Sequence, residues 1–271
     1  MKTLNLLLAY GLMSLTVTAA TAATQPTKPA KQVAVQASKY SAAQIVERNI
    51  AARGGLQAWR AVQTLTLSGR LEAGGKENTQ LPFVMEMKRP HKSRLEISFR
   101  DQTAFQVYDG TQGWKVRPFL NRNDVEPFTP DEAKMAANWM ELDGPLVDYA
   151  SKGTTISLQG IEAVEGRNAY KLKLTLKGGS ERNVWIDAAT FLEAKIDGDP
   201  RKMDGKLRNV AIFCRDYKSA NGLTVPHVLE TVVEGVKQSH KMTIEQVAVN
   251  RPLEDSLFAK PGLKMAAASS Q

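Results

Sequence analysis

Apolar and polar residues alternate over short stretches of this chain, and this alternation is its clearest structural signal. Phe83, Met85 and Met87 occupy every second position of one stretch, with a polar or smaller residue between them. Residues 64–71 and 95–99 repeat the pattern with leucine, isoleucine and phenylalanine. Successive side chains of a β-strand point to opposite faces, so this period of two indicates an antiparallel sheet that is covered on one side only.

The alternation is expected to continue through Phe105 and Val107 and to stop at about Leu120. Strands are predicted again between residues 154 and 249, where Asn221-Gly222 is a strong signal for a two-residue hairpin turn. The whole pattern predicts about ten or eleven strands.

Two helical segments interrupt the strands. The first is predicted over residues 41–53, because Ser41 and Gln44 can form a capping box and Gly54-Gly55 can end the helix. A short helical turn is predicted directly after it, over residues 56–61.

The second helical segment is predicted over residues 131–142, with Pro130 at its first position. Asp143-Gly144-Pro145 ends it, and residues 146–149 are predicted to form a further short helical piece. A sheet with one apolar face needs a partner layer, so these helices are expected to cover that face. The predicted fold class is therefore mainly β (α+β), with one long, curved antiparallel sheet.

The N-terminus has the pattern of a secretory signal peptide over residues 1–22. Lys2 supplies the positive charge, residues 4–17 are largely apolar, and Ala20-Thr21-Ala22 fits a cleavage site between small residues. No cysteine lies near this site. We therefore expect an exported chain whose signal peptide is cleaved and which is not lipidated.

The rest of the chain is expected to form one domain. Residues 23–38 are rich in proline, lysine and alanine without periodicity, which predicts a flexible leader. Residues 39–265 are assigned to the domain, and residues 266–271 to a flexible tail.

The residues that usually carry chemistry are sparse and scattered. The single cysteine, Cys214, excludes a disulfide within the chain, and its apolar strand predicts that it is buried. His91, His227 and His240 lie on different predicted elements without a partner at ligand spacing. No catalytic residue, metal site or cofactor is predicted, and the chain is not expected to be an enzyme.

The formal net charge is +8 at pH 7. The charges are dispersed along the chain, so a nucleic-acid partner is not expected. The positive balance could favour anionic surfaces such as lipid head groups, or it could serve solubility alone. Both interpretations stay open at this point.

Three segments together resemble the LolA-like family of periplasmic lipoprotein carriers. Residues 83–114, with Lys88-Arg89-Pro90 and Asp109-Gly110, look like the central meander of those carriers. Residues 142–153 occupy the place of their lid helix, and residues 258–262 resemble their closing Phe-x-Pro-x-Gly segment.

The resemblance implies an unclosed antiparallel β half-barrel whose concave apolar face is lidded by helices and binds acyl chains. Arg89 matches the arginine that, in the carriers, hydrogen-bonds carbonyl groups of the lid and keeps the ligand-free form closed. Arg89 is therefore expected to be a latch for the segment around residues 143–149. A surface arginine at a strand end would look the same in the sequence.

By the same resemblance, the expected cargo is an acylated lipoprotein or a lipid, with a membrane-bound donor or acceptor protein as a further partner. The protein is expected to be periplasmic and monomeric. The residues expected to line the cavity are Leu65, Leu67, Phe83, Met85, Met87, Leu95, Ile97, Phe99, Phe105, Val107, Trp114, Met135, Trp139 and Leu146.

Two segments depart from the compact carriers. Residues 206–249 are additional β material, and residues 52–59 form an unusual start to the domain. These departures leave open a second interpretation, in which the same fold belongs to a non-catalytic sensor or adaptor that binds a domain of a membrane protein. An ordinary apolar core would also account for the methionine and aromatic residues.

Overall fold

The computed structural model describes residues 38–72, 78–139 and 141–262, with only the backbone described at residues 138 and 139. The predicted signal peptide, the predicted leader up to residue 37 and the predicted tail lie outside the described residues. None of the helices within the described ranges combines the length and the hydropathy that crossing a bilayer requires.

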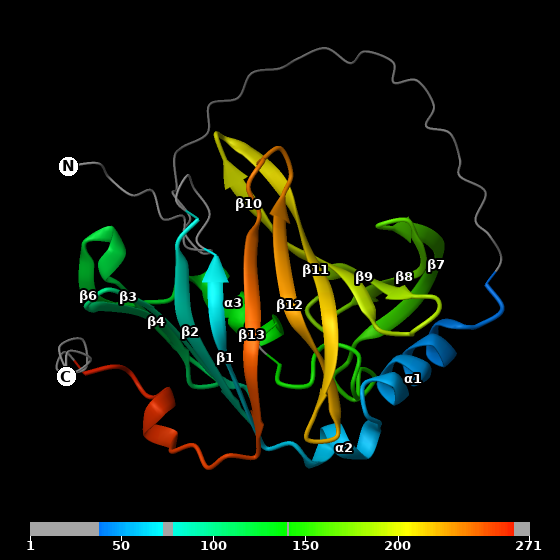
Figure 1. The fold of residues 1–271 in the computed structure, drawn as a ribbon, viewed down its shortest axis with the longest axis horizontal. Coiled ribbons are helices and arrows are strands. Elements are labelled where there is room, and N and C mark those ends of the chain that lie inside the picture. The colour runs from blue at the N-terminus through cyan, green and yellow to red at the C-terminus, as the bar shows by residue number, and fades with distance from the viewer. Residues whose placement is uncertain (1–37, 73–77, 140, 263–271) are drawn as a thin grey trace.

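All the strands of the described residues belong to one antiparallel sheet of thirteen strands (Figure 1). Its order is β6-β5-β4-β3-β2-β1-β13-β12-β11-β10-β9-β8-β7, so the first and last strands of the chain pair in the interior. The strands are β1 (Thr64–Glu72), β2 (Gln80–Lys88), β3 (Lys92–Phe99), β4 (Gln102–Tyr108), β5 (Gly113–Arg117), β6 (Arg122–Pro127), β7 (Thr155–Val164), β8 (Arg167–Thr175), β9 (Glu181–Asp187), β10 (Glu193–Met203), β11 (Lys206–Ala220), β12 (Leu223–Val233) and β13 (His240–Val249).

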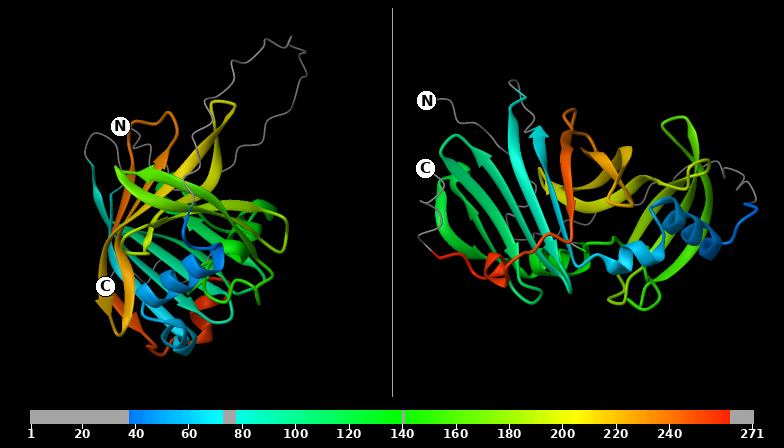
Figure 2. Two further views of the ribbon diagram at one scale, coloured as in Figure 1. Left: turned by 90° about the vertical axis from the view of Figure 1, so that its right-hand side faces the viewer. Right: turned by 60° about the horizontal axis from the view of Figure 1, so that its bottom comes forward.

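The sheet is curved and unclosed, because its edge strands β6 and β7 do not pair with each other (Figure 2). The predicted mainly β half-barrel is thereby confirmed. The predicted number of strands was too low, partly because β6 was missed. Its sequence Arg-Asn-Asp-Val-Glu-Pro is polar and mostly exposed, and an edge strand that pairs only with β5 needs no apolar face.

The helices are α1 (Ala42–Ala52), α2 (Leu56–Ala61) and α3 (Pro130–Trp139), with short 3₁₀ turns η1 (Pro118–Leu120) and η2 (Asp255–Phe258). The predicted capping box of α1 is confirmed, since Ser41 and Gln44 exchange both hydrogen bonds. The prediction of a helical piece over residues 146–149 was wrong. Gly144 (φ 77°) and Asp148 (φ 51°) take the left-handed conformation there, which a right-handed helix does not tolerate, and the segment forms turns instead.

The corner between α1 and α2 fits against the predicted Asn221-Gly222 turn, which joins β11 to β12 as expected. Gly54 has φ 110°, and a Cβ atom on it would lie 2.3 Å from the carbonyl oxygen of Gly222. The Thr224 amide donates to the carbonyl of Arg53 at 2.9 Å. Glycine at position 54 is therefore required by both its conformation and this close approach.

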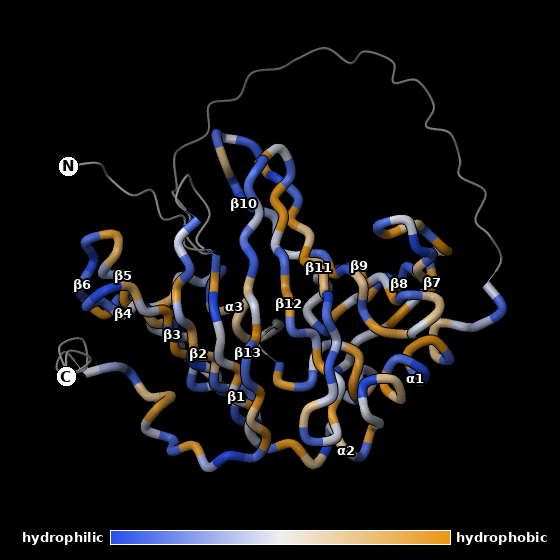
Figure 3. The backbone as a smooth tube through the Cα atoms, viewed as in Figure 1, coloured by the Kyte–Doolittle hydropathy of each residue, from blue (hydrophilic) through white to orange (hydrophobic). Residues whose placement is uncertain are grey.

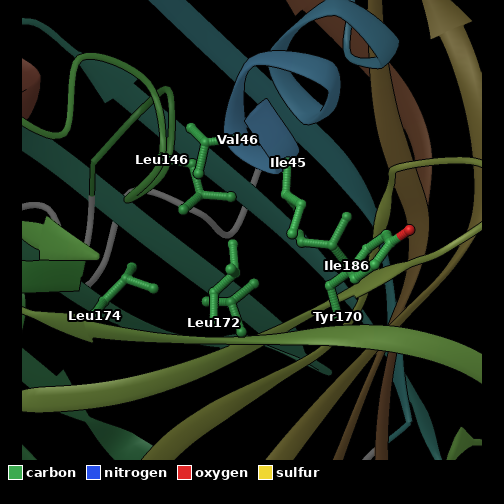
Figure 4. Close-up of a cluster of buried hydrophobic side chains, with 8 residues drawn as sticks. Ile45, Val46, Leu146, Tyr170, Leu172, Leu174 and Ile186 are labelled. Carbon is green, nitrogen blue, oxygen red and sulfur yellow. The ribbon is translucent and has the colours of Figure 1, made fainter. Parts of the chain in front are cut away.

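Hydrophobic and hydrophilic residues alternate along the strands (Figure 3), and α1 covers the apolar face of β8 and β9. Ile45 and Val46 of α1 pack with Leu172 and Ile186, and Figure 4 shows these side chains converging together with Leu146. A second cluster forms around Trp59 of α2, which is 1% exposed. The expectation that helices cover the apolar face is thus confirmed for α1 and α2.

Candidate functional site

The concave face of β1, β2 and β3 carries most of the apolar residues predicted to bind a ligand. Directly paired residues of antiparallel strands share a face, and Met85 pairs with both Leu67 and Leu95. The predicted residues brought together on this face are Leu65, Leu67, Phe83, Met85, Met87, Leu95, Ile97 and Phe99.

Coverage of this face is uneven. Leu65 and Met87 are buried against Trp59 of α2 and Val147. Leu67, Met85, Leu95 and Phe99 are only half-buried, although they pack against buried core residues. The face therefore presents partly accessible apolar side chains between β1 and β3.

Phe105, Val107 and Trp114 do not join this face, and the placement predicted for them was wrong. The turn after β3 has two residues, so Phe99 pairs with Gln102. Even-numbered residues of β4 consequently share the concave face, and odd-numbered residues face outward. Phe105 pairs with Glu96, and Val107 pairs with Trp114 on the convex side.

The convex side of β4 is covered by the C-terminal segment. Val107 and Phe258 are both 0% exposed and pack with Leu253. The Lys88 ammonium donates to the Leu253 carbonyl at 2.6 Å and lies 2.8 Å from the carboxylate of Asp255. The segment that resembles the closing motif of the carriers therefore seals the outside of the sheet.

The three predicted cavity residues between the two halves of the chain have different surroundings. Leu146 is fully buried, but it packs with α1, β8 and β9 rather than with β1–β3. Met135 is half-buried on α3. The side chain of Trp139 lies outside the described part of the structure.

A buried ion pair anchors the start of α3 to the sheet. Lys115 shares the concave face with its partner Gln106, and its ammonium contacts the carboxylate of Glu132. The side chains of Lys115 and Glu132 are 5% and 8% exposed. Glu132 also accepts from the Thr129 amide at 2.8 Å, while the Thr129 hydroxyl accepts from the Glu132 amide at 3.3 Å. This is a capping box, so the anchored carboxylate also fixes the first turn of the helix.

Arg89 holds the segment that follows α3. Its Nε donates to the carbonyl of Val62 at 2.8 Å, and its Nη2 donates to the carbonyl of Trp59 at 3.1 Å. The same Nη2 lies 2.7 Å from Oδ2 of Asp143, whose side chain is 3% exposed. Arg89 therefore binds the C-terminal end of α2 through two backbone carbonyl groups and binds the segment around Asp143 through a carboxylate, so it ties the two together.

Two further cations converge on the same segment. The Lys152 ammonium lies 2.7 Å from Oδ1 of Asp143 and also contacts Glu141. Arg53 Nη1 donates to the backbone carbonyl of Asp143 at 3.1 Å. Because each contact brings a positive group to an acceptor on residues 141–143, the segment is fixed from several elements at once.

The fourth cation is Arg60 of α2, which donates to both carboxylate oxygens of Asp148 at 2.9 and 2.6 Å. This hydrogen bonding holds the pKa of Asp148 below its ordinary value. We call Arg53, Arg60, Arg89 and Lys152 the clasp. Sequence reasoning found only Arg89 among them. The sequence does contain a signal for the anchor of α3, namely the capping-box pattern Thr129-x-x-Glu132.

A polar group lies buried beside the clasp. Glu193 of β10 accepts a hydrogen bond from the Tyr217 hydroxyl at 3.0 Å and lies 3.4 Å from Arg53.

Cys214 is buried as predicted, and burial raises the pKa of its thiol to about 12. The thiol therefore stays protonated at neutral pH. Within the described ranges, no three His, Cys, Asp or Glu side chains are placed to hold a metal ion.

A pocket of about 450 Å³ lies away from the concave face. It is formed where β1 begins, between Lys88 and the residues of the C-terminal segment, and Thr64 and Arg251 contribute to it. None of the predicted cavity residues lines it.

No family model matches the sequence, and no curated protein matches it. Among solved structures, a LolA superfamily protein from Nitrosomonas europaea is similar at 14% identity, with a TM-score of 0.53. The match covers 82% of this chain and 98% of that one. A domain assigned to outer membrane lipoprotein sorting, from Vibrio parahaemolyticus, is similar at 15% identity with the same coverage and TM-score.

These similarities span nearly the whole length of both solved chains, and they coincide with an unclosed antiparallel sheet whose apolar concave face is partly covered by helices. The chain therefore has the LolA-like fold, in a divergent form.

Proposed function

We propose that this protein is a periplasmic carrier or binding protein that shelters the acyl chains of a lipoprotein or lipid. The acyl chains would lie against the concave face of β1, β2 and β3. The observation that supports this most directly is the row of half-buried apolar side chains there, around Met85 and Leu95, next to a segment held mainly by charged contacts.

We call residues 129–139 and 141–143 the lid; this segment contains α3 and ends where residues 142–153, which the resemblance compares with the lid helix of the carriers, begin. Of its described α3 side chains, Glu132 and Ala136 are buried, and the contacts that fix its two ends are ionic. When such a segment moves away, its separated charges become solvated by water, which offsets part of the lost attraction. A lid held in this way can open at lower cost than a segment held by a large apolar contact.

Binding of an acyl chain would supply the free energy for this movement. Burial of one CH₂ group contributes about 0.8 kcal/mol, so a sixteen-carbon chain gains roughly 12 kcal/mol before the cost of ordering it. The half-buried methionines suit such a ligand, because their flexible side chains adapt to an irregular apolar shape.

The comparisons support this proposal at the level of the fold. The proteins of similar structure include a LolA superfamily member and a domain assigned to lipoprotein sorting. The signal-peptide pattern at the N-terminus supports a periplasmic location. We further propose that the protein acts as a monomer without catalysis and that a membrane-bound protein donates or accepts the cargo.

Replacing Arg89 with leucine is expected to favour the lipid-bound state. The variant loses the contact with Asp143, and a charge-assisted hydrogen bond of about 1.4 kcal/mol corresponds to a tenfold change in the equilibrium. After incubation with a palmitoylated peptide, native mass spectrometry should show a ratio of lipid-free to lipid-bound protein that is about tenfold lower than for the unchanged protein.

Arg70→Leu is the matched control. Arg70 also forms an ion pair, with Glu245 at 3.0 Å, but both side chains are at least half exposed and lie away from the lid. The control should leave the ratio unchanged. If Arg89→Leu also leaves it unchanged while lipid is bound, Arg89 is not a latch, even though the protein is a lipid binder.

A further inference from the structure

The hairpin of β10 and β11 projects at the end of the sheet opposite to α2 (Figure 1). Its turn is formed by Asp204 (φ 49°) and Gly205 (φ 74°). Two successive residues with positive φ characterise the tight turn that matches the twist of a hairpin. The residues on either side of this turn therefore belong to two paired strands, which hold their side chains at the tip of the hairpin.

Leu207, next to this turn, is 71% exposed. Among the described residues, the other exposed large hydrophobic side chain is Leu120, at 41%. Leu207 pairs across the hairpin with Lys202, which is also exposed. A leucine side chain that is this exposed contributes little to the stability of the hydrophobic core.

Cations surround this leucine on both faces of the hairpin. Lys202 shares the face of Leu207, whereas Lys206 lies on the opposite face, where Arg201 pairs with Arg208. Asp204 is the one acidic residue between positions 201 and 208. The turn between β12 and β13, which carries the exposed Lys237, lies beside the hairpin, since Asn209 donates to Glu234 at 2.9 Å.

From this juxtaposition of an exposed leucine and cations on a projecting hairpin, we infer that the tip of β10–β11 docks on an anionic phospholipid bilayer. Leu207 enters the boundary between head groups and acyl chains, while Lys202 and Lys206 lie at the level of the phosphates. Apolar insertion and attraction to anionic lipids act together in this kind of peripheral binding.

A bilayer fits these observations better than a protein partner does. A stable protein interface buries about 800 Å² on each side and needs shape complementarity, whereas a two-residue turn offers a narrow tip. Cations on both faces of the hairpin suit a surface that is negatively charged everywhere around the point of contact. The inference depends on this tip alone and does not require the proposed function of the concave face.

The test measures binding of the purified protein to vesicles of phosphatidylcholine, with and without about 30% phosphatidylglycerol. The unchanged protein should bind the anionic vesicles at least tenfold more tightly, and the preference should fall as salt rises from about 0.05 M to about 0.5 M. Lys202→Glu/Lys206→Glu should lose the preference. Lys177→Glu/Lys218→Glu is the control, because it makes the same change in net charge at exposed residues outside the tip.

A probe at the tip gives a second readout. Cys214 is the single cysteine and is buried, so a cysteine introduced by Leu207→Cys can be labelled selectively with an environment-sensitive fluorophore. Its emission should shift to the blue with anionic vesicles, whereas the same label at Leu120→Cys should not shift. The unsubstituted protein treated with the same reagent gives the background.

Three outcomes would overturn the inference. The unchanged protein could show no preference for anionic vesicles, the two charge-reversed variants could bind equally, or the labels at positions 207 and 120 could respond alike. Far-ultraviolet circular dichroism of each variant distinguishes loss of folding from loss of docking. Loss of docking with retained binding of a palmitoylated peptide would leave the proposed acyl-binding function intact.

Discussion

Glu132→Leu is expected to increase amide hydrogen exchange in α3 by about 100-fold. The substitution leaves the ammonium of Lys115 buried against the sheet without its partner. Removing one member of a buried ion pair costs about 3 kcal/mol or more, and this cost is relieved when α3 moves away and water reaches the lysine. Hydrogen exchange measured by mass spectrometry should therefore show a selective increase over residues 130–139.

The double variant Lys115→Met/Glu132→Leu is the matched control for this prediction. Two apolar side chains replace the ion pair, so no buried charge remains and exchange in α3 should return most of the way to that of the unchanged protein. The small remaining increase comes from the Thr129 amide, which has lost its acceptor on Glu132. If the single and double variants exchange alike, the effect comes from loss of the capping box rather than from the buried lysine. Equal exchange in Glu132→Leu and the unchanged protein would show that this pair does not anchor the lid.

Met85→Gln is expected to weaken binding of a palmitoylated peptide by about 10- to 100-fold. The amide has nearly the shape of the methionine side chain, but an acyl chain lying over it removes its water without offering a hydrogen bond. An unsatisfied buried polar group costs about 1–3 kcal/mol. Isothermal titration calorimetry with the peptide measures the change in affinity.

Val84→Gln provides the control on the adjacent residue of the same strand. Both Val84 and Met85 are half-buried, but Val84 pairs with Ser68 and Glu96 on the convex face. Its substitution should leave the affinity within about twofold of the unchanged protein, because it does not meet the ligand. A similar loss of affinity at both positions would place the acyl chain elsewhere or indicate a general change in the sheet.

Alternation in the sequence predicted the concave face of β1, β2 and β3, because the leucine, isoleucine, methionine and phenylalanine residues of these strands fall on alternate positions. It failed at β4 for a local reason. The number of residues in the turn decides which positions share a face, and the two-residue turn after Phe99 places Phe105 outward. A difference of one residue in this turn would reverse the faces of β4, and the apolar side chains themselves give no sign of it.

The candidate latch was predicted by a motif, and its contacts depend on tertiary structure. Arg89 and Asp143 are 54 residues apart in the sequence, and Arg53 and Asp143 are 90 residues apart. Charged residues are common in this chain, so their pairing over such separations is not visible in a pattern of residue types. The Leu207 tip was similarly hidden, since an exposed leucine in an alternating strand looks like a residue of the core.

The central claim is that the concave face binds acyl chains, and native mass spectrometry of the protein purified from the periplasm tests it most directly. If the concave face binds acyl chains, the spectrum should contain an additional bound mass that is released by organic extraction and contains acyl lipid. The amount bound should fall in Met85→Gln but not in Val84→Gln. A bare protein that also refuses added phospholipid and palmitoylated peptide would contradict the account and favour a sensor or adaptor that binds another protein.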